Sequence, residues 1–356
     1  MSTRVIAEIG TAHAGDDARA RELVDAAVEA GADIVKTQIV YAGEIVHPNT
    51  GPVELPGGPV PLFERFRELE VAPDFFVRLA DHCEHRGVAF LASCFGPRSL
   101  ADLLHLRASA VKIASPELNH APLLQSVRDA GLELILSSGV STLCDIERAL
   151  HVTGVDSTTL LHCVTAYPAP ETEYNLRTIS TLSAAFGVSV GISDHSTDPV
   201  LVPAAAVALG APVVEKHFTL SRTYGGLDDP IALEPQPFAE MVAAIRAAET
   251  QSTDATLADL AARYGTDRLA AVLGDGVKRL AAAEAANYGR SNRSILATAN
   301  IAAGELLGPE NIAVLRSEKN IEPGLSPFHW ETVAGARATR DIADGTGILW
   351  EHLIRR

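Results

Sequence analysis

The stretch GISDHSTDPVLVPAAAVALGAPVVEKHF, residues 191–218, predicts a strand, a helix and a second strand. Such a unit belongs to a parallel sheet and places both strand ends on the same side. Alternation along each strand sends Ser193 and His195 to one face of the first strand, and Glu215 and His217 to one face of the second. The two imidazoles can therefore converge on a divalent metal, with positions left for water and substrate. The alternative is two unrelated histidines at strand ends, because sequence spacing does not by itself show convergence.

The same alternation of strand and helix recurs through the preceding part of the chain. Residues 4–10 (RVIAEIG) predict a strand, and residues 17–32 (DARARELVDAAVEAGA) predict an amphipathic helix. Roughly eight such units predict an α/β fold, the (β/α)8 TIM barrel, with its active site at the carboxyl ends of the strands. The strands are expected at residues 4–10, 33–40, 88–95, 110–115, 132–139, 159–168, 188–195 and 213–218.

Two further segments stand apart from this repeat. The segment of residues 42–61 is rich in Gly and Pro and longer than a simple connection between two elements needs, so we expect it to face a substrate. Composition changes after a helix expected at 235–250. We therefore predict a barrel domain over residues 1–269, an Ala-rich and partly helical linker over 270–291, and a module of short strands and turns over 292–356. A module of this size is expected to lean on the barrel.

The composition excludes several classes of partner. The chain has 29 Lys and Arg against 45 Asp and Glu, a net charge of −16, which argues against nucleic acid or an anionic membrane. Its 4 cysteines lack the spacing of a zinc knuckle or a disulfide framework. The N-terminus lacks a secretion-signal pattern, so we expect a cytoplasmic protein without a membrane-spanning segment.

Polar and charged side chains gather late in the predicted strands or directly after them. A barrel interior also holds some structural polar residues. Lys36 and Lys112 are harder to explain in that way, since a lysine in an apolar strand is costly unless it meets an anion, a metal-bound ligand or a carbonyl. The set comprises Glu8, Lys36, Gln38, Ser93, Lys112, Ser115, Glu117, Ser137, Ser138, His162, Thr165, Tyr167, Ser193, His195, Glu215 and His217.

Motifs along nearly the whole chain resemble the sialic acid synthase family, a PEP-dependent barrel enzyme followed by an antifreeze-like (SAF) domain. They include AEIGTAHAGD (7–16), GADIVKTQ (31–38), VKIASPELNH (111–120), SSGVST (137–142), LLHCVTAYP (160–168), GISDHSTD (191–198), GDGVKR (274–279), NRSILA (292–297) and GLSPFHWETVAGARATRDI (324–342). The resemblance implies condensation of phosphoenolpyruvate (PEP) with the aldehyde of an N-acyl mannosamine-type sugar, which yields a nine-carbon 2-keto acid and phosphate.

The resemblance also implies roles for individual residues. His195 and His217 become ligands of a divalent metal, Mn²⁺, Mg²⁺ or Co²⁺. The expected PEP contacts are Lys112, Ser93, Ser115, Ser137 and Ser193, and the expected sugar-side residues are Lys36, Gln38, Tyr167 and Asp228. Thr165 is a further candidate for substrate binding. Glu8 and Glu117 are candidates for the general base and for a positioning or acid role, and the sequence leaves open which does which.

A homodimer is a further implication, with the C-terminal module of one chain covering the barrel of the other and Arg316 reaching the sugar in trans. The alternative is a module folded back on its own barrel. The chain departs from the family pattern at Thr165, at Ser93-Cys94-Phe95 and over residues 316–324, so the condensation is more secure than the identity of the sugar.

Other functions need weighing beside this one. The same PEP condensation could act on a different aldose. A Schiff-base pyruvate aldolase would use Lys112 or Lys36 as nucleophile and would need no metal. A carbohydrate-binding or ice-binding role could rest on the C-terminal module, but it leaves the polar residues of the strand ends unexplained.

Overall fold

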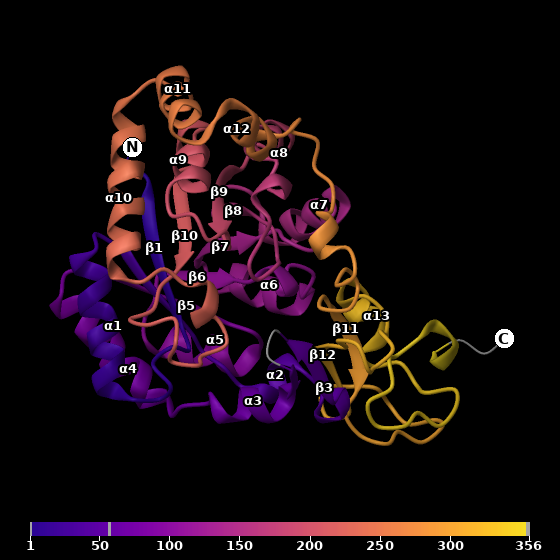
Figure 1. Cartoon of the computed structure of the whole chain (residues 1–356). Coiled ribbons are helices and arrows are strands. Elements are labelled where there is room, and N and C mark those ends of the chain that lie inside the picture. Colours follow the sequence, from indigo (N-terminus) through magenta and orange to yellow (C-terminus); the bar gives the residue numbers. More distant parts are fainter. Residues whose placement is uncertain (1, 56–57, 354–356) are drawn as a thin grey trace.

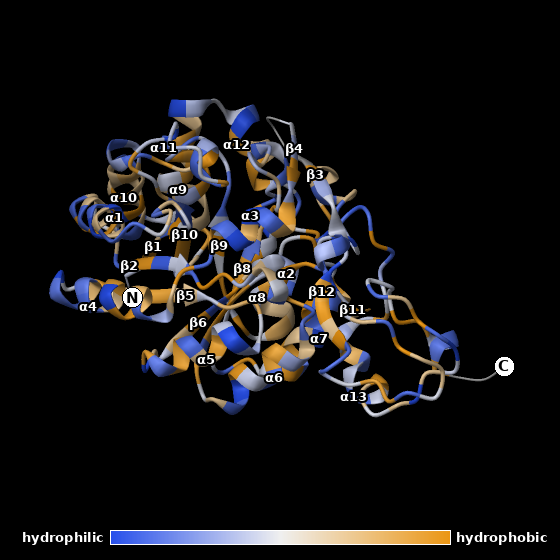
Figure 2. Ribbon diagram, turned by 90° about the horizontal axis from the view of Figure 1, so that it is seen from below, coloured by the Kyte–Doolittle hydropathy of each residue, from blue (hydrophilic) through white to orange (hydrophobic). Residues whose placement is uncertain are grey.

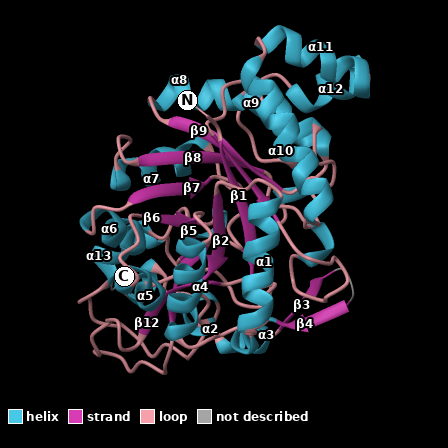
Figure 3. Ribbon diagram, turned by 90° about the vertical axis from the view of Figure 1, so that its left-hand side faces the viewer, coloured by secondary structure: helices cyan, strands magenta, loops and turns pink. Residues whose placement is uncertain are grey.

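The computed structural model describes residues 2–55 and 58–353. Eight parallel strands close into a barrel in the order β1-β10-β9-β8-β7-β6-β5-β2, which confirms the predicted TIM barrel. Figure 3 shows these strands at the centre of a ring of helices. The barrel strands are β1 (Arg4–Gly10), β2 (Ile34–Gln38), β5 (Ala89–Ser93), β6 (Ala110–Ile113), β7 (Glu133–Ser137), β8 (Thr158–Cys163), β9 (Ser189–Asp194) and β10 (Val213–His217).

A helix follows each barrel strand before the next one begins, and α10 follows the last. The helices bury an apolar stripe on the barrel and turn their charged residues outward, as α4 does in Figure 2. In the part of the chain that is described, no helix is long and apolar enough to cross a membrane. The ring comprises α1 (Asp17–Glu29), α4 (Pro73–His85), α5 (Pro97–His105), α6 (Ala121–Asp129), α7 (Leu143–Thr153), α8 (Thr178–Phe186), α9 (Leu201–Ala208) and α10 (Pro235–Thr250).

Two helices beyond α10 were not anticipated, α11 (Thr253–Tyr264) and α12 (Thr266–Leu273). Their presence explains the composition of α9, LVPAAAVA, in which residues 201–207 are all buried. Helices α10, α11 and α12 pack against α9, so it has no face left for polar residues.

The segment after β2 forms a small layer of its own. It contains α2 (Ala42–Ile45), the hairpin β3 (Pro52–Leu55) and β4 (Gly58–Pro61), and α3 (Leu62–Glu68). Residues 56 and 57 of the predicted substrate-facing segment lie outside the described residues. Val53, Leu62 and Phe66 from this layer line the large cavity at the barrel mouth, where the sequence placed this segment.

The C-terminal part forms a separate small core beside the barrel (Figure 1). It contains the antiparallel strands β11 (Arg293–Ala297) and β12 (Ile312–Arg316) and the short helix α13 (Trp330–Val333), and most of the rest is turns. Met1 and the last three residues of the predicted module, 354–356, lie outside the described residues.

The barrel interior is apolar at one level and polar at the next. Ile6, Ile34, Leu91, Ile135, Leu161 and Val213 form a buried cluster across the strands. Strand β9 has Gly191 at this level. A larger residue would not fit there, because an added Cβ would lie 2.4 Å from the Val213 carbonyl oxygen and 2.9 Å from Leu161 Cδ2. Two residues further along each strand, the inward side chains are polar, so this cluster is the floor of the candidate site.

Candidate active site

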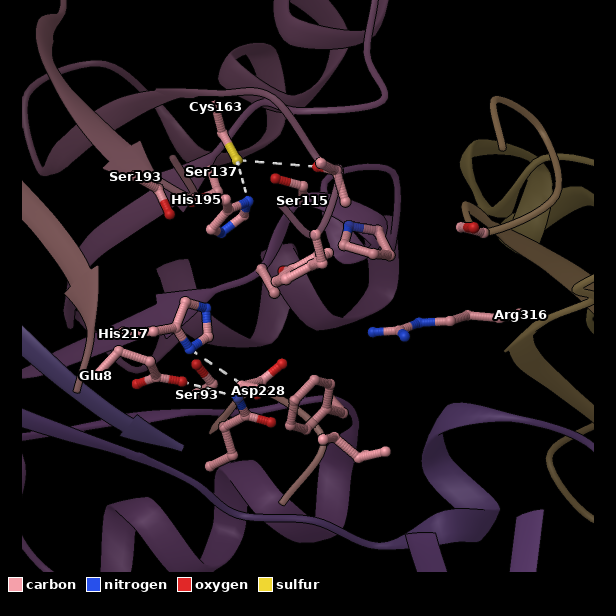
Figure 4. A pocket seen from close by; sticks show the side chains of 18 of the residues that line it. Glu8, Ser93, Ser115, Ser137, Cys163, Ser193, His195, His217, Asp228 and Arg316 are labelled. Carbon is pink, nitrogen blue, oxygen red and sulfur yellow. Dashed lines mark hydrogen bonds and ion pairs between the residues drawn. The ribbon is translucent and has the colours of Figure 1, made fainter. Parts of the chain in front are cut away.

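A cavity of about 370 Å³ opens above this floor, at the carboxyl ends of the barrel strands. The structure brings nearly all the predicted site residues to it, and Figure 4 shows many of them converging. From the predicted set, the lining includes Glu8, Lys36, Gln38, Ser93, Lys112, Ser115, Ser137, Thr165, Tyr167, Ser193, His195, His217, Asp228 and Arg316. Glu117 lies behind the lining, and Ser138 and His162 of the strand-end set do not line this cavity either.

Lys36 is buried among carboxylates at one side of the cavity. Its Nζ lies 2.6 Å from Glu8 Oε2 and 3.6 Å from Glu215 Oε2, and it donates to Ser93 Oγ at 3.0 Å. Burial acts to lower the pKa of Lys36, but the charges of Glu215 and Glu8 outweigh it and raise that pKa. Lys36 therefore keeps its positive charge inside the barrel.

Lys112, on β6 and separated from β2 only by β5, is less fully compensated. Its Nζ donates to Ser137 Oγ at 2.7 Å, and the nearest carboxylate oxygen, Glu215 Oε1, is 3.8 Å away. Burial lowers the pKa of Lys112 more than the charge of Glu215 raises it. An ammonium group with this little compensation would be stabilised by an anion entering the cavity.

Glu215 is the carboxylate that both lysines share. Ser193 Oγ donates to its Oε1 at 2.9 Å. Although burial acts to raise the pKa of Glu215, Lys112 and Lys36 lower it to about 2. The sequence placed Glu215 at the strand end but gave it no role, because alternation cannot show which lysines a carboxylate will meet.

A polar corner formed by β1, β2 and the segment after β10 closes one end of the cavity. Gln38 Nε2 donates to Glu8 Oε1 at 2.7 Å. Gly10 has a φ of +51°, and an added Cβ there would lie 3.3 Å from Gln38 Nε2 and 3.4 Å from Asp228 Oδ2. A side chain at Gly10 would therefore strain the backbone and crowd the corner where these polar groups meet.

The two histidines converge as the sequence predicted. Their ring centroids are 5.3 Å apart, and Tyr167 stacks on His195 with a centroid distance of 4.3 Å. The ring of His195 is oriented from behind, because Nδ1 donates to the Val164 carbonyl oxygen at 2.9 Å and the backbone N–H donates to Tyr174 Oη at 2.7 Å. This leaves Nε2 of His195 as the ring nitrogen able to act as a ligand.

These two imidazoles fit a divalent metal of the catalytic kind. Burial and the charge of His195 lower the pKa of His217 to about 3, so its ring is neutral, which is the form that binds metals. Burial alone would lower the pKa of His195, but Cys163 and Val164 raise it to about 9, so metal binding must displace a proton there. No group of three His, Cys, Asp or Glu gathers among the described residues to hold a metal. Water and substrate would therefore fill the other positions.

Behind the histidines, a buried ion pair joins the ends of β9 and β10. Lys216 Nζ lies 2.6 Å from Asp194 Oδ2 and donates to the Ser196 carbonyl oxygen at 2.5 Å, and both side chains of the pair have no exposed area. Because Asp194 and Lys216 each precede a histidine, the pair holds the two strand ends in register.

Glu117 does not line the cavity, since it connects the barrel to the C-terminal domain. Its Oε1 accepts from Arg293 Nη2 at 2.8 Å and from Arg316 Nη2 at 2.7 Å. The side chains of Glu117 and Arg293 are fully buried, whereas that of Arg316 keeps 14% of its area exposed and reaches the cavity. The sequence offered Glu117 as a general base, but in the structure its bonded oxygen is engaged by two guanidinium groups.

In the single chain Arg316 reaches the cavity of its own barrel, and its expected contact in trans within a homodimer stays a prediction. The linker is not a free helical spacer. Apart from the end of α12 and one 3₁₀ turn at Ala282–Glu284, it is irregular. It is also fastened to its own barrel, since Glu284 Oε1 accepts from Val140 N at 2.8 Å and from Thr165 N at 2.6 Å.

Three residues that line the cavity had no role predicted from the sequence, Cys163, Glu318 and Lys319. Cys163 lies at the inner face of β8, two residues beyond Leu161, so alternation could have identified it. Glu318 and Lys319 come from the turn after β12, in the run where the chain departs from the family pattern. Glu318 adopts a φ of +50° there, and burial raises its pKa.

Known proteins resemble this chain along almost its whole length. The spore coat polysaccharide biosynthesis protein SpsE of Bacillus subtilis is 37% identical over 98% of this chain and 93% of that protein. Its crystal structure superimposes with a TM-score of 0.84 at 35% identity, covering 100% of this chain and 96% of the other. The N,N'-diacetyllegionaminic acid synthase of Legionella pneumophila is 31% identical over 99% of this chain and 95% of that protein.

Two family models match consecutive parts of the sequence. The model of the NeuB family matches residues 23–256, and that of the SAF domain matches residues 292–354. The barrel, the polar cavity and these matches together show that the chain belongs to the NeuB family of synthases and carries a C-terminal SAF domain.

Proposed function

We propose that the protein condenses PEP with an N-acyl mannosamine-type aldose, to give a sialic-acid-like 2-keto acid and phosphate. The observation that carries the proposal is a strongly acidic chain with two buried lysines and four serines around one cavity. The serines are Ser93, Ser115, Ser137 and Ser193. Their hydroxyls and the ammonium groups suit the phosphate and carboxylate of PEP. The name of the Legionella relative supports the class of product.

Lys112 is the residue that we assign to the anionic groups of PEP. It lies deep in the cavity beside Ser137, with only a distant carboxylate as counter-ion. Lys36 already has Glu8 and Glu215 around it, so it is suited to hold those carboxylates in place while contacting the substrate. The two lysines therefore offer unequal electrostatic sites, and an anion is expected to favour the side of Lys112.

The sugar is assigned to the corner formed by Glu8, Gln38 and Asp228, beside Tyr167. Glu8 is suited to proton transfer there. Among the described residues, its Oε2 pairs only with Lys36, and its Oε1 accepts a hydrogen bond only from Gln38. Burial raises the pKa of Asp228, which favours a proton on its carboxyl group. A divalent metal on His195 and His217 would polarise the aldehyde oxygen as a Lewis acid when bound. We assign Glu8 rather than Glu117 to proton transfer, because Glu117 is held by Arg293 and Arg316.

We propose that the condensation proceeds in three steps. C3 of PEP attacks the aldehyde carbon and forms the new C–C bond, while the aldehyde oxygen takes up a proton. Water adds to C2 of the resulting cation and gives up a proton. The tetrahedral carbon then loses phosphate by cleavage of its C–O bond while its hydroxyl group gives its proton to the leaving phosphate, which leaves the 2-keto acid.

The choice of aldose is a separate part of the proposal. Arg316, Glu318 and Lys319 bring two cations and one carboxylate from the C-terminal domain to the cavity mouth. They lie in the run that departs from the family pattern, so an aldose with different substituents remains the alternative within the same reaction. A screen of N-acyl hexosamines with PEP, read by phosphate release and product mass, identifies the substrate.

Replacing Lys112 by Met should weaken the handling of PEP, whereas Gln38→Ala should affect the sugar. A hydrogen bond to a charged group contributes about 1.5–3 kcal/mol, so we expect KM for PEP to rise roughly 10–100-fold in Lys112→Met. KM for the sugar should change little in that variant and rise in Gln38→Ala. Steady-state kinetics with each substrate varied in turn measures both. Equal effects of Lys112→Met on the two KM values would contradict the assignment.

Removal of the metal should abolish turnover. EDTA treatment is expected to stop phosphate release, and Mn²⁺ or Co²⁺ should restore it, because no described residue adds a third protein ligand to His195 and His217. His217→Ala should lower kcat by orders of magnitude and lose the metal in equilibrium dialysis. His151→Ala, on the exposed face of α7, is the matched control. Full activity in EDTA, with a pyruvate adduct trapped by borohydride, would support the Schiff-base aldolase in its place.

In the homodimer that the family resemblance implies, we propose that the C-terminal domain covers the barrel of the partner, and the alternative is that it acts on its own barrel. A swapped dimer would rebuild the contacts of Glu117 with Arg293 and Arg316 between two chains. We therefore mix Lys112→Ala with Arg316→Ala subunits, after each is shown to be severely impaired. The arrangement in trans predicts recovery of about a quarter of wild-type sites after verified subunit exchange. No recovery would show that the domain acts on its own barrel.

A further inference from the structure

A second cavity of about 330 Å³ lies outside the barrel, between the end of β8, the start of α8 and linker residues 274–284. In Figure 1 this linker descends from α12 past α7 toward β11. Alternation along β8 turns Cys163 toward the first cavity and His162 outward to the second. Lys278, His162 and Thr178 contribute the polar groups on which the inference rests.

Lys278 is buried without a counter-ion. Its side chain is 8% exposed, and its Nζ donates to the Ser138 carbonyl oxygen at 3.3 Å. It forms no ion pair with any residue that the structure describes. Although Glu284 raises the pKa of Lys278, burial lowers it by more. An ammonium group in this position is costly unless an anion joins it.

The acidic residues around this cavity are already engaged elsewhere. Glu284 accepts from the backbone N–H groups of Val140 and Thr165, and Glu173 accepts from that of Ala283 at 2.8 Å. Asp275 pairs with Arg279 at 2.9 Å. Each carboxylate therefore has donors of its own, which leaves Lys278 as the donor in need of an acceptor.

His162 needs the opposite kind of group. Its Nε2 donates to the Tyr174 carbonyl oxygen at 2.5 Å, so in the neutral ring Nδ1 is an acceptor. Burial lowers the pKa of His162 to about 3, which keeps the ring neutral. Nδ1 is buried and finds no hydrogen-bond partner among the described residues, and the same holds for Thr178 Oγ1. Orphaned polar atoms beside a cavity indicate a missing polar occupant.

We propose that this cavity binds a small oxyanion that also carries a hydroxyl group. Its charged oxygen accepts from Lys278, and its hydroxyl donates to Nδ1 of His162. Inorganic phosphate has both features near neutral pH, and so has a hydroxy-carboxylate of the sugar-acid type. Occupancy would fasten linker residues 274–284 to β8, directly behind the wall of the first cavity.

Isothermal titration calorimetry of the full chain tests the proposal with phosphate, gluconate and sulfate as probes. Lys278→Met should bind one phosphate or one gluconate fewer per chain than the wild type, while Lys112→Met should keep this event. The difference in the number of anions bound per chain between the wild type and Lys278→Met does not depend on what the first cavity binds. Sulfate lacks a proton at neutral pH and should bind this site at least tenfold more weakly than phosphate, because it cannot donate to His162.

Circular dichroism and thermal unfolding show whether Lys278→Met folds. Because the substitution removes an uncompensated buried charge, the midpoint temperature of unfolding of Lys278→Met should be equal to or higher than that of the wild type in the absence of anions. Thr178→Val, which keeps Lys278, should weaken the same event several-fold and serves if the first variant fails to fold. Binding of gluconate but not phosphate would identify a hydroxy-carboxylate as the occupant. Unchanged binding in both variants, no binding of either probe, or sulfate binding as tight as phosphate would overturn the proposal.

Discussion

Two ammonium groups are buried inside one barrel, and most of the candidate site is arranged to compensate them. Lys36 and Lys112 project inward from β2 and β6, on either side of β5, just above an apolar floor. Glu215 lies between them, with Glu8 beside Lys36. A buried charge is tolerated only when it is paired and hydrogen-bonded. Because Lys112 is paired least, the barrel favours an anion at one defined place.

The same principle governs the docking of the C-terminal domain. Its small core would be marginal alone, and the contact with the barrel is made by a buried carboxylate between two arginines. Glu117 therefore couples the position of the domain to the shape of the cavity, since Arg316 both pairs with it and lines the site. Replacing one member of such a cluster would leave an uncompensated charge, which costs more than the cluster contributes.

Alternation and the repeat of strand and helix were sufficient to predict the barrel, the order of its strands along the chain and the residues that face its mouth. They could not predict pairings, because these depend on distances between strands. The role of Glu215 between the two lysines and the engagement of Glu117 by Arg293 are of this kind. Helices α11 and α12 were not predicted. The apolar, Ala-rich composition of α9 indicates that this helix is buried, but it does not show which segments cover it. The attachment of the linker to the barrel could not be predicted either, since Glu284 binds backbone groups far away in sequence.

We propose that the anion held by Lys112 is PEP and that C3 of PEP reacts while its phosphate leaves with the bridging oxygen. PEP labelled with ¹⁸O between C2 and phosphorus tests this claim in one turnover, with mass spectrometry of both products. The label is expected in inorganic phosphate, because water attacks C2 and the C–O bond breaks. Label retained in the 2-keto acid, or formation of the same acid from pyruvate without PEP, would contradict it.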